Sequence, residues 1–140
     1  MKQGDHAPGI AVLRVPLANR GTAFTARDRE HLGLTGLLPP RVESLAEQAA
    51  RVIENLRGKP APIEKYLYLC ALQNDNETLF YRVLLDNLQE LLPIVYTPTV
   101  GQACLEWSRR YVKPRGLYVT TADRGHVAAL LAHWKNCDIG

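Results

Sequence analysis

The sequence predicts a mainly α protein, in which a helical bundle domain is followed by one strand and one helix that begin an α/β domain. Apolar side chains recur at helical spacing in successive segments between residues 25 and 111, a pattern typical of helices that bury one face. Capping residues and prolines separate these segments where helices start or stop. Residues 116–121 are short and rich in β-forming residues, which predicts a strand.

The boundaries of the expected helices follow from local signals. Thr25 and Ser44 each precede an acidic residue by three positions, the spacing of a capping box that opens a helix. The segment 60–62 supplies proline at the start of the next helix, where proline is tolerated. Residues 74–76 should end that helix and cap another, which Pro93 is expected to stop.

The apolar stripes of these helices predict the core of one domain over residues 20–114. The expected core residues are Leu45, Ala49, Val52, Ile53, Leu56, Ile63, Tyr66, Leu67, Cys70, Ala71, Tyr81, Leu84, Leu85, Leu88, Leu92, Val100, Ala103, Cys104, Trp107 and Tyr111. Residues 1–19 have weak periodicity and are expected to form a loosely held arm. Residues 115–140 should be the truncated start of the α/β domain, with a last helix capped by Asp123. Because one strand cannot complete a sheet, we expect the chain to be a fragment of a larger protein.

Composition and charge exclude several classes of protein. The net charge of +3 over 140 residues is too mild to favour a nucleic-acid binder. No run approaches the ~18 apolar residues of a membrane span, and no targeting segment is recognisable. Cys70, Cys104 and Cys137 are odd in number and lack the C-x-x-C spacing of a metal or redox motif. We therefore expect buried thiols in a reducing compartment, with the cytoplasm as the simplest location.

Tyr96 is the strongest candidate for chemistry. It lies between Pro93 and Pro98, and the two prolines restrict the backbone of the connector on which its hydroxyl is presented. A phenol held in place can donate a proton or a hydrogen bond. The alternative is a tyrosine whose ring packs against the core and whose hydroxyl bonds a carbonyl.

The chain contains a series of ordered blocks: RGTAFT (20–25), LGLTGLLPP (32–40), IEKY (63–66), ETLFYRVLL (77–85), PIVYTPTVGQAC (93–104), PRGL (114–117) and DRGH (123–126). Together these blocks resemble the N-terminal part of the malic enzymes, a family of NAD(P)-dependent decarboxylating malate dehydrogenases. They cover roughly residues 20–140, nearly the whole chain. The resemblance implies a helical N-terminal domain that provides subunit contacts in a homo-oligomer, a dimer or a tetramer.

The resemblance also implies a reaction, the oxidative decarboxylation of L-malate to pyruvate and CO₂ with NAD or NADP and with Mg²⁺ or Mn²⁺. In this family the tyrosine of the YTPTVG block protonates the enol, and that residue is Tyr96. The family's lysine beside this tyrosine, its substrate-binding arginine and its metal carboxylates belong to blocks that are missing here. No G-x-G-x-x-G turn is present. We therefore expect no cofactor-binding or metal residues in this chain, and no activity from it alone.

Arg51 and Glu43 form a second candidate site, for an effector or a subunit interface. They match an arginine and an acid of the fumarate site in fumarate-activated malic enzymes, but Asp75 stands where that site has a second arginine. A carboxylate there repels a dicarboxylate, so fumarate activation is doubtful. The alternative is that Arg51 simply pairs on a helix surface.

Other readings remain open. His126 and His133 are two helical turns apart, too far to share a metal ion, and are expected to be structural. Residues Arg109, Arg110, Lys113 and Arg115 are better explained by a helix end than by nucleic acid.

Two alternatives to a malic enzyme remain. A malolactic enzyme shares the motif set. A helical interaction or regulatory module without catalysis would also lack the lysine, the substrate-binding arginine and the metal carboxylates of the family.

Overall fold

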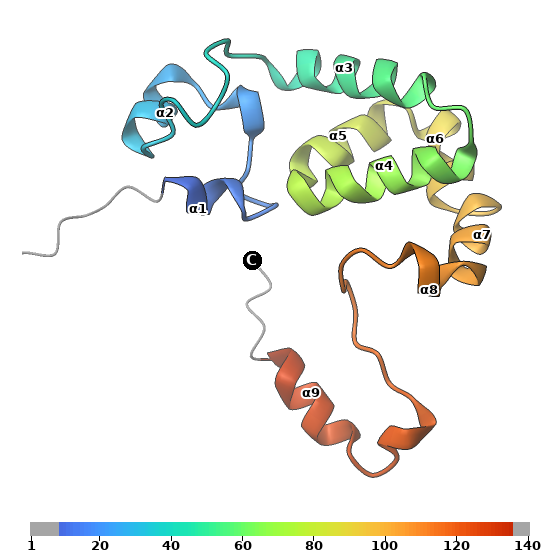
Figure 1. Ribbon diagram of the computed structural model, residues 1–140. Coiled ribbons are helices and arrows are strands. Elements are labelled where there is room, and N and C mark those ends of the chain that lie inside the picture. Colours follow the sequence, from blue (N-terminus) through green and yellow to red (C-terminus); the bar gives the residue numbers. More distant parts are fainter. Residues whose placement is uncertain (1–8, 136–140) are drawn as a thin grey trace, which may run out of the picture. The chain divides into compact units, whose positions relative to one another are not determined.

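The structure, a computed structural model, describes residues 9–135 and divides after Glu106 into two compact units (Figure 1). The first unit contains α1 (Ile10–Leu13), η1 (Gly21–Ala23), α2 (Ala26–His31), α3 (Leu45–Arg57), α4 (Pro62–Asp75), α5 (Glu77–Asp86), α6 (Leu88–Val95) and α7 (Thr99–Leu105). The second contains α8 (Trp107–Arg110), η2 (Thr121–Asp123) and α9 (Val127–Lys135). The prediction of a mainly helical chain is confirmed.

Helix α3 forms as its local sequence predicts. Ser44 Oγ accepts a hydrogen bond from the Glu47 amide at 3.2 Å, and the Glu47 carboxylate accepts one from the Ser44 amide at 2.7 Å. These bonds from Ser44 lower the pKa of Glu47. The predicted stripe Ala49, Val52 and Leu56 is buried, which confirms this part of the core.

Helix α4 lies at the centre of the first unit, where it packs against α3, α5, α6 and α7. Its buried residues are Ile63 and Leu69, and Leu69 is only 1% exposed. The stripe expected from the sequence is thus wrong in part, because Tyr66 and Cys70 are half-buried and Ala71 is exposed. The remainder of the core comes mainly from α3, α5 and α6.

The predicted stop at Pro93 is wrong, because the helix breaks earlier, at Asn87. The Asn87 backbone leaves helical geometry at φ −130° and ψ 32°. Its side-chain Nδ2 donates to the Val83 carbonyl at 3.0 Å. In a continuous helix this carbonyl would accept from the Asn87 amide, so the side chain competes with the helical hydrogen bond. Pro93 instead lies inside α6, which runs on to Val95.

The core prediction for the α5 and α6 segment is also wrong at most positions, although Leu84 does pack against the core. The predicted residues Tyr81, Leu85, Leu88 and Leu92 are 47%, 69%, 47% and 49% exposed. The buried residues are Leu79, Phe80, Val83, Leu91 and Ile94. Both faces of this segment are apolar, so periodicity did not decide which of them packs against α3 and α4.

The second unit differs from its prediction in two places. The helix expected to reach Tyr111 ends at Leu105, and Trp107 and Tyr111 are exposed on α8 and just after it. The predicted strand 116–121 is wrong, because no second extended segment pairs with it in residues 9–135. Trp107 contacts Tyr111 and Tyr118 with ring centroids 5.7 and 6.3 Å apart, so the chain folds back on itself here.

The last predicted helix forms as α9, with a different start. Asp123 closes a capping box with Thr120 at the beginning of η2, and α9 begins only at Val127. The expectation of buried thiols is wrong for Cys104, which is exposed, and Cys70 is only half-buried. The side chain of Trp134 and the whole of Cys137 lie outside the described residues. None of the helices in the described part of the chain is long and apolar enough to cross a membrane.

Candidate functional site

Tyr96 stands at the carboxyl end of α6, where the chain turns toward α7. Its amide donates to the Leu92 carbonyl at 2.9 Å, and its carbonyl accepts from the Val100 amide at 2.9 Å. The backbone of Tyr96 is therefore tied to both helices, and α6 and α7 pack against each other and against α4. Thr99, three residues on, is 4% exposed and anchors the start of α7.

The Tyr96 side chain itself is 65% exposed. The side chain is therefore accessible from solvent and is not sealed inside the core. The alternative was a tyrosine whose ring packs against the core. The exposure of Tyr96 does not support it.

Tyr66 is a second tyrosine with a distinct environment, which the sequence placed only in a core stripe. It lies one turn before Cys70 on α4, and burial, together with a hydrogen bond to the Cys70 thiol, raises the pKa of Tyr66 to about 12. Cys104 on α7 adds to the same effect. A phenol with this pKa keeps its proton, which suits a packing role. In the sequence, the four-residue spacing of Tyr66 and Cys70 was the signal that could have indicated this contact.

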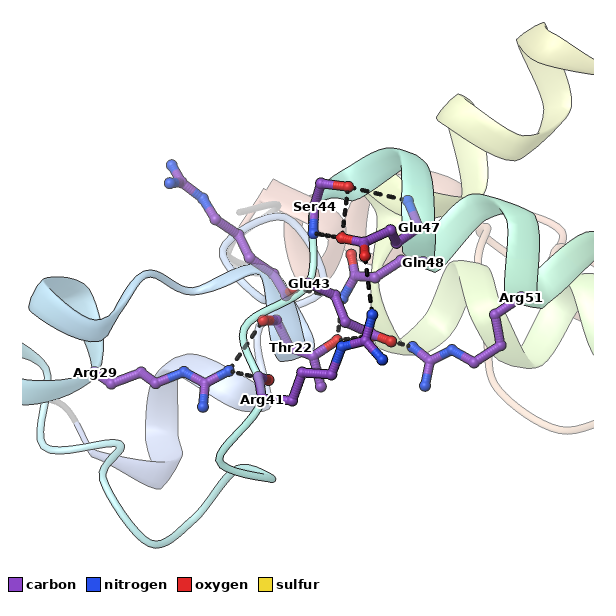
Figure 2. A network of polar contacts seen from close by, with 9 residues as sticks. Thr22, Arg29, Arg41, Glu43, Ser44, Glu47, Gln48 and Arg51 are labelled. Atoms are coloured by element: carbon purple, nitrogen blue, oxygen red, sulfur yellow. Dashed lines mark hydrogen bonds and ion pairs between the residues drawn. The ribbon is translucent and has the colours of Figure 1, made fainter.

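Glu43 and Arg51, which are eight residues apart, meet in the structure (Figure 2). Arg51 Nη2 lies 2.9 Å from Glu43 Oε2, and the side chains are 52% and 14% exposed, respectively. The Thr22 hydroxyl donates to the same Glu43 oxygen. The largely covered carboxylate of Glu43 is thus held by Thr22 and contacts an accessible guanidinium.

Gln48 extends this network toward the chain before α2. Its Nε2 donates to Thr22 Oγ1 at 2.8 Å and to the Arg20 carbonyl at 3.0 Å. The residue is 2% exposed, and its Oε1 has no hydrogen-bond partner. Gly21, beside it, has φ +51°, and a Cβ there would lie 3.2 Å from Gln48 Nε2. Glycine is therefore favoured at this position, because other residues rarely adopt this φ and a Cβ would crowd the Gln48 amide.

Arg29 is connected to this network through the backbone carbonyl of Thr22, and nothing in the sequence singled it out. Its guanidinium is 6% exposed and donates to five carbonyls. Those acceptors belong to Phe24, Thr22, Pro39, Pro40 and Arg41, at distances from 2.6 to 3.3 Å. All five N–H donors of an arginine are therefore used.

A cavity of about 300 Å³ lies between the network and α4. Arg51 and Gln48 reach it from α3, and Tyr68 and Asp75 reach it from α4. Tyr96 is not among its lining residues. The structure thus brings Glu43 and Arg51 together with Asp75 near a cavity, and leaves Tyr96 at a separate place on the same unit.

Possible metal ligands are spread over the described residues. No group of three or more histidine, cysteine, aspartate or glutamate side chains in residues 9–135 is placed to bind a metal. His126 and His133 are both exposed.

Comparison with known proteins identifies the family. Residues 73–140 match the family model described as the malic enzyme N-terminal domain. The chain is 46% identical over 131 residues to the hydrogenosomal malic enzyme of Neocallimastix frontalis, which covers 94% of the chain and 22% of that protein. It is 52% identical over 128 residues to NAD-dependent malic enzyme 3 of Bacillus subtilis, 91% of the chain and 23% of the relative.

A human relative extends this range. The NADP-dependent malic enzyme of Homo sapiens is 45% identical over 133 residues, 95% of the chain and 23% of the relative. The chain thus spans less than a quarter of the length of these curated relatives. The ordered sequence blocks, the helical domain and these matches agree. The chain therefore belongs to the malic enzyme family and carries its N-terminal domain.

Proposed function

We propose that this chain is the N-terminal part of a malic enzyme that converts L-malate to pyruvate and CO₂ with reduction of NAD or NADP. The proposal is supported by identities of 46% and 52% to relatives named as malic enzymes, over more than nine-tenths of the chain. The relatives include proteins named as NAD-dependent malic enzymes and proteins named as NADP-dependent malic enzymes. The cofactor, and the Mg²⁺ or Mn²⁺ of the full-length enzyme, would be bound by residues outside those described.

Tyr96 is the residue that this chain contributes to the reaction. Its hydroxyl hydrogen passes to the methylene carbon of the enol, giving the methyl group of pyruvate. The proton of the enol hydroxyl leaves at the same time and returns to the phenolate through a neighbouring group. The observation that carries this role is the 65% exposed ring on a backbone held from both sides. General acid catalysis by a positioned side chain contributes roughly 10²–10⁴-fold to a rate.

The test is Tyr96→Phe in the full-length enzyme. We expect kcat for pyruvate formation to fall roughly 10²-fold or more, with an unchanged melting temperature because the ring is exposed. Tyr111→Phe is the matched control, since Tyr111 is a 49% exposed tyrosine outside the exposed stripe of α5 and α6 and should leave kcat unaltered. Full activity of Tyr96→Phe would remove the catalytic role.

The isolated chain should neither turn over malate nor bind the dinucleotide. We expect no saturable heat when NAD or NADP is titrated into it, and micromolar binding would contradict the proposal. The exposed stripe of Tyr81, Leu85, Leu88 and Leu92 supports subunit contacts in a homo-oligomer. Residues 115–140 would begin the next domain, and the three cysteines are compatible with a reducing cytoplasm.

Arg51 and Glu43 would form a regulatory site rather than part of the catalytic centre. The covered Glu43 carboxylate fixes the Arg51 guanidinium beside a cavity, and Tyr96 does not line that cavity. A preorganised cation next to a cavity is the arrangement that binds a small anionic group. We propose this cavity as an effector site of the enzyme.

A further inference from the structure

Two cysteine side chains lie on helices that pack against each other. Cys70 is on α4 and is half-buried, whereas Cys104 is on the last turn of α7 and is exposed. Helices α4 and α7 are in contact within the first unit. Ala103, which precedes Cys104, is 2% exposed, so this turn of α7 lies against its neighbours. The two thiols therefore belong to one contact between helices.

Tyr66 is a neighbour of both sulfurs. Its hydroxyl makes a hydrogen bond to Cys70, one turn further along α4. Burial, this hydrogen bond and the charge of the Cys104 thiolate all raise the pKa of Tyr66. Because salt and water screen a charge within about 10 Å, Cys104 acts on this hydroxyl from nearby. One sulfur from each helix thus lies in the surroundings of a single phenol.

The two thiols differ in their access from solvent. Cys104 is exposed, and the residue after it, Leu105, is 91% exposed, so a small oxidant can reach the last turn of α7. Cys70 is half-buried and its sulfur contacts the Tyr66 hydroxyl. Susceptibility to oxidation follows the exposure of a thiol, and redox-sensing sites pair an accessible cysteine with a second one that resolves it. The described cysteines have this combination.

From this arrangement we infer that Cys104 and Cys70 form a reversible redox site that reacts with a hydroperoxide. The Cys104 sulfur attacks one oxygen of the peroxide and the O–O bond breaks. Cys104 becomes a sulfenic acid, and the other oxygen takes the thiol proton and leaves as water or an alcohol. The Cys70 sulfur then attacks the sulfur of the sulfenic acid, the S–O bond breaks, and the hydroxyl leaves as water with the Cys70 proton.

The product is a disulfide that links α4 to α7. The two electrons that reduce the peroxide come from the two sulfurs, and a thiol reductant returns them by disulfide exchange. In a reducing compartment such a bond is transient and regulatory, which agrees with the thiol state of both cysteines in this structure. Neither Tyr96 nor the cavity beside Arg51 takes part in this chemistry, so failure of either proposed role would leave it untouched.

The experiment treats the full-length enzyme with a stoichiometric amount of hydrogen peroxide and maps its cysteines by mass spectrometry after tryptic digestion without reductant. Trypsin cuts after Lys65, Arg82 and Arg109, so Cys70 and Cys104 fall in separate peptides, 66–82 and 83–109. We expect these peptides as one disulfide-linked species, lighter than their sum by two hydrogen atoms. Dithiothreitol should release the two peptides. Non-reducing electrophoresis should show the oxidised protein at the mass of a single chain.

Variants separate the roles of the two cysteines. Cys70→Ser should leave Cys104 as a sulfenic acid that dimedone traps, because the resolving sulfur is absent. Cys104→Ser should leave Cys70 as a thiol, because the accessible sulfur is absent. Cys137→Ser is the matched control and should form the linked species as the parent does. Far-UV circular dichroism shows that each variant is folded.

The parent protein alone can refute the pairing. Linkage of Cys104 to any cysteine other than Cys70, linkage between two chains, or oxidation of Cys104 without linkage to Cys70 would overturn it. Retention of both thiols would overturn the redox site itself, whatever the outcome for Tyr96→Phe.

Discussion

Replacing Arg29 by alanine should unfold or strongly destabilise the first unit. The guanidinium makes five hydrogen bonds to carbonyls between Thr22 and Arg41, and the residue is 6% exposed. A hydrogen bond to a charged group contributes about 1.5–3 kcal/mol. If water replaces the lost donor at all but two of the carbonyls, the loss is about 3–6 kcal/mol. That is a large part of the total stability of a domain, about 5–15 kcal/mol.

Urea denaturation followed by far-UV circular dichroism measures this free energy of unfolding. Arg29→Lys should recover only part of the loss, because one ammonium cannot reach carbonyls spread around a planar fork. Arg27→Ala on the same helix is the control, since Arg27 is exposed and its loss should change stability by less than about 0.5 kcal/mol. A loss below about 1 kcal/mol for Arg29→Ala would refute the reasoning, because it is the ordinary effect of a point mutation.

Three further predictions test the core and two titrating groups. Leu69→Ala, at a 1% exposed position, should cost about 2–5 kcal/mol in urea denaturation, whereas Leu85→Ala at a 69% exposed position should cost less than about 0.5 kcal/mol; equal losses would contradict the assigned core. The hydrogen bond from Arg57 lowers the pKa of Glu90, so the stabilisation from this pair is present above the ordinary pKa of 4.5 and is lost as the pH falls through the folded value. Melting of Glu90→Gln should therefore match the parent in acid and fall below it at neutral pH, and a constant difference would rule the pair out. Burial raises the pKa of Tyr66 from 10.0 to about 12, so its stabilising effect is full below pH 10 and is lost as the pH rises through about 12. Absorbance titration of Tyr66→Phe should lack that late step, and an unchanged curve would refute the assignment.

Local signals in the sequence were read correctly where local bonds determine the structure. The capping boxes at Thr25 and Ser44 form as predicted, because each closes within four residues. The stripe on α3 is correct because only one face of that helix is apolar. In these places sequence and structure carry the same information.

Predictions from the sequence were wrong or missing where contacts between segments distant in the chain determine which residues are buried. On α5 and α6 two apolar faces compete, and packing against α3 and α4 selected Val83 and Leu91 rather than Leu85 and Leu88. Arg29 could not be recognised, because its acceptors are backbone carbonyls as far as 12 residues away. The cavity beside Arg51 was likewise out of reach, since its walls come from segments separated along the chain.

The break at Asn87 gives α6 the geometry of a short lever with Tyr96 at its far end. Eight residues at 1.5 Å each make a rod of roughly 12 Å, so a tilt of about 10° at the joint would carry the tyrosine roughly 2 Å. Proton transfer requires contact within a narrower range than that. Leu91, fully buried between the joint and the tyrosine, resists such a tilt. In the proposed reaction, the position of the Tyr96 hydroxyl would thus depend on a leucine that is buried in the core.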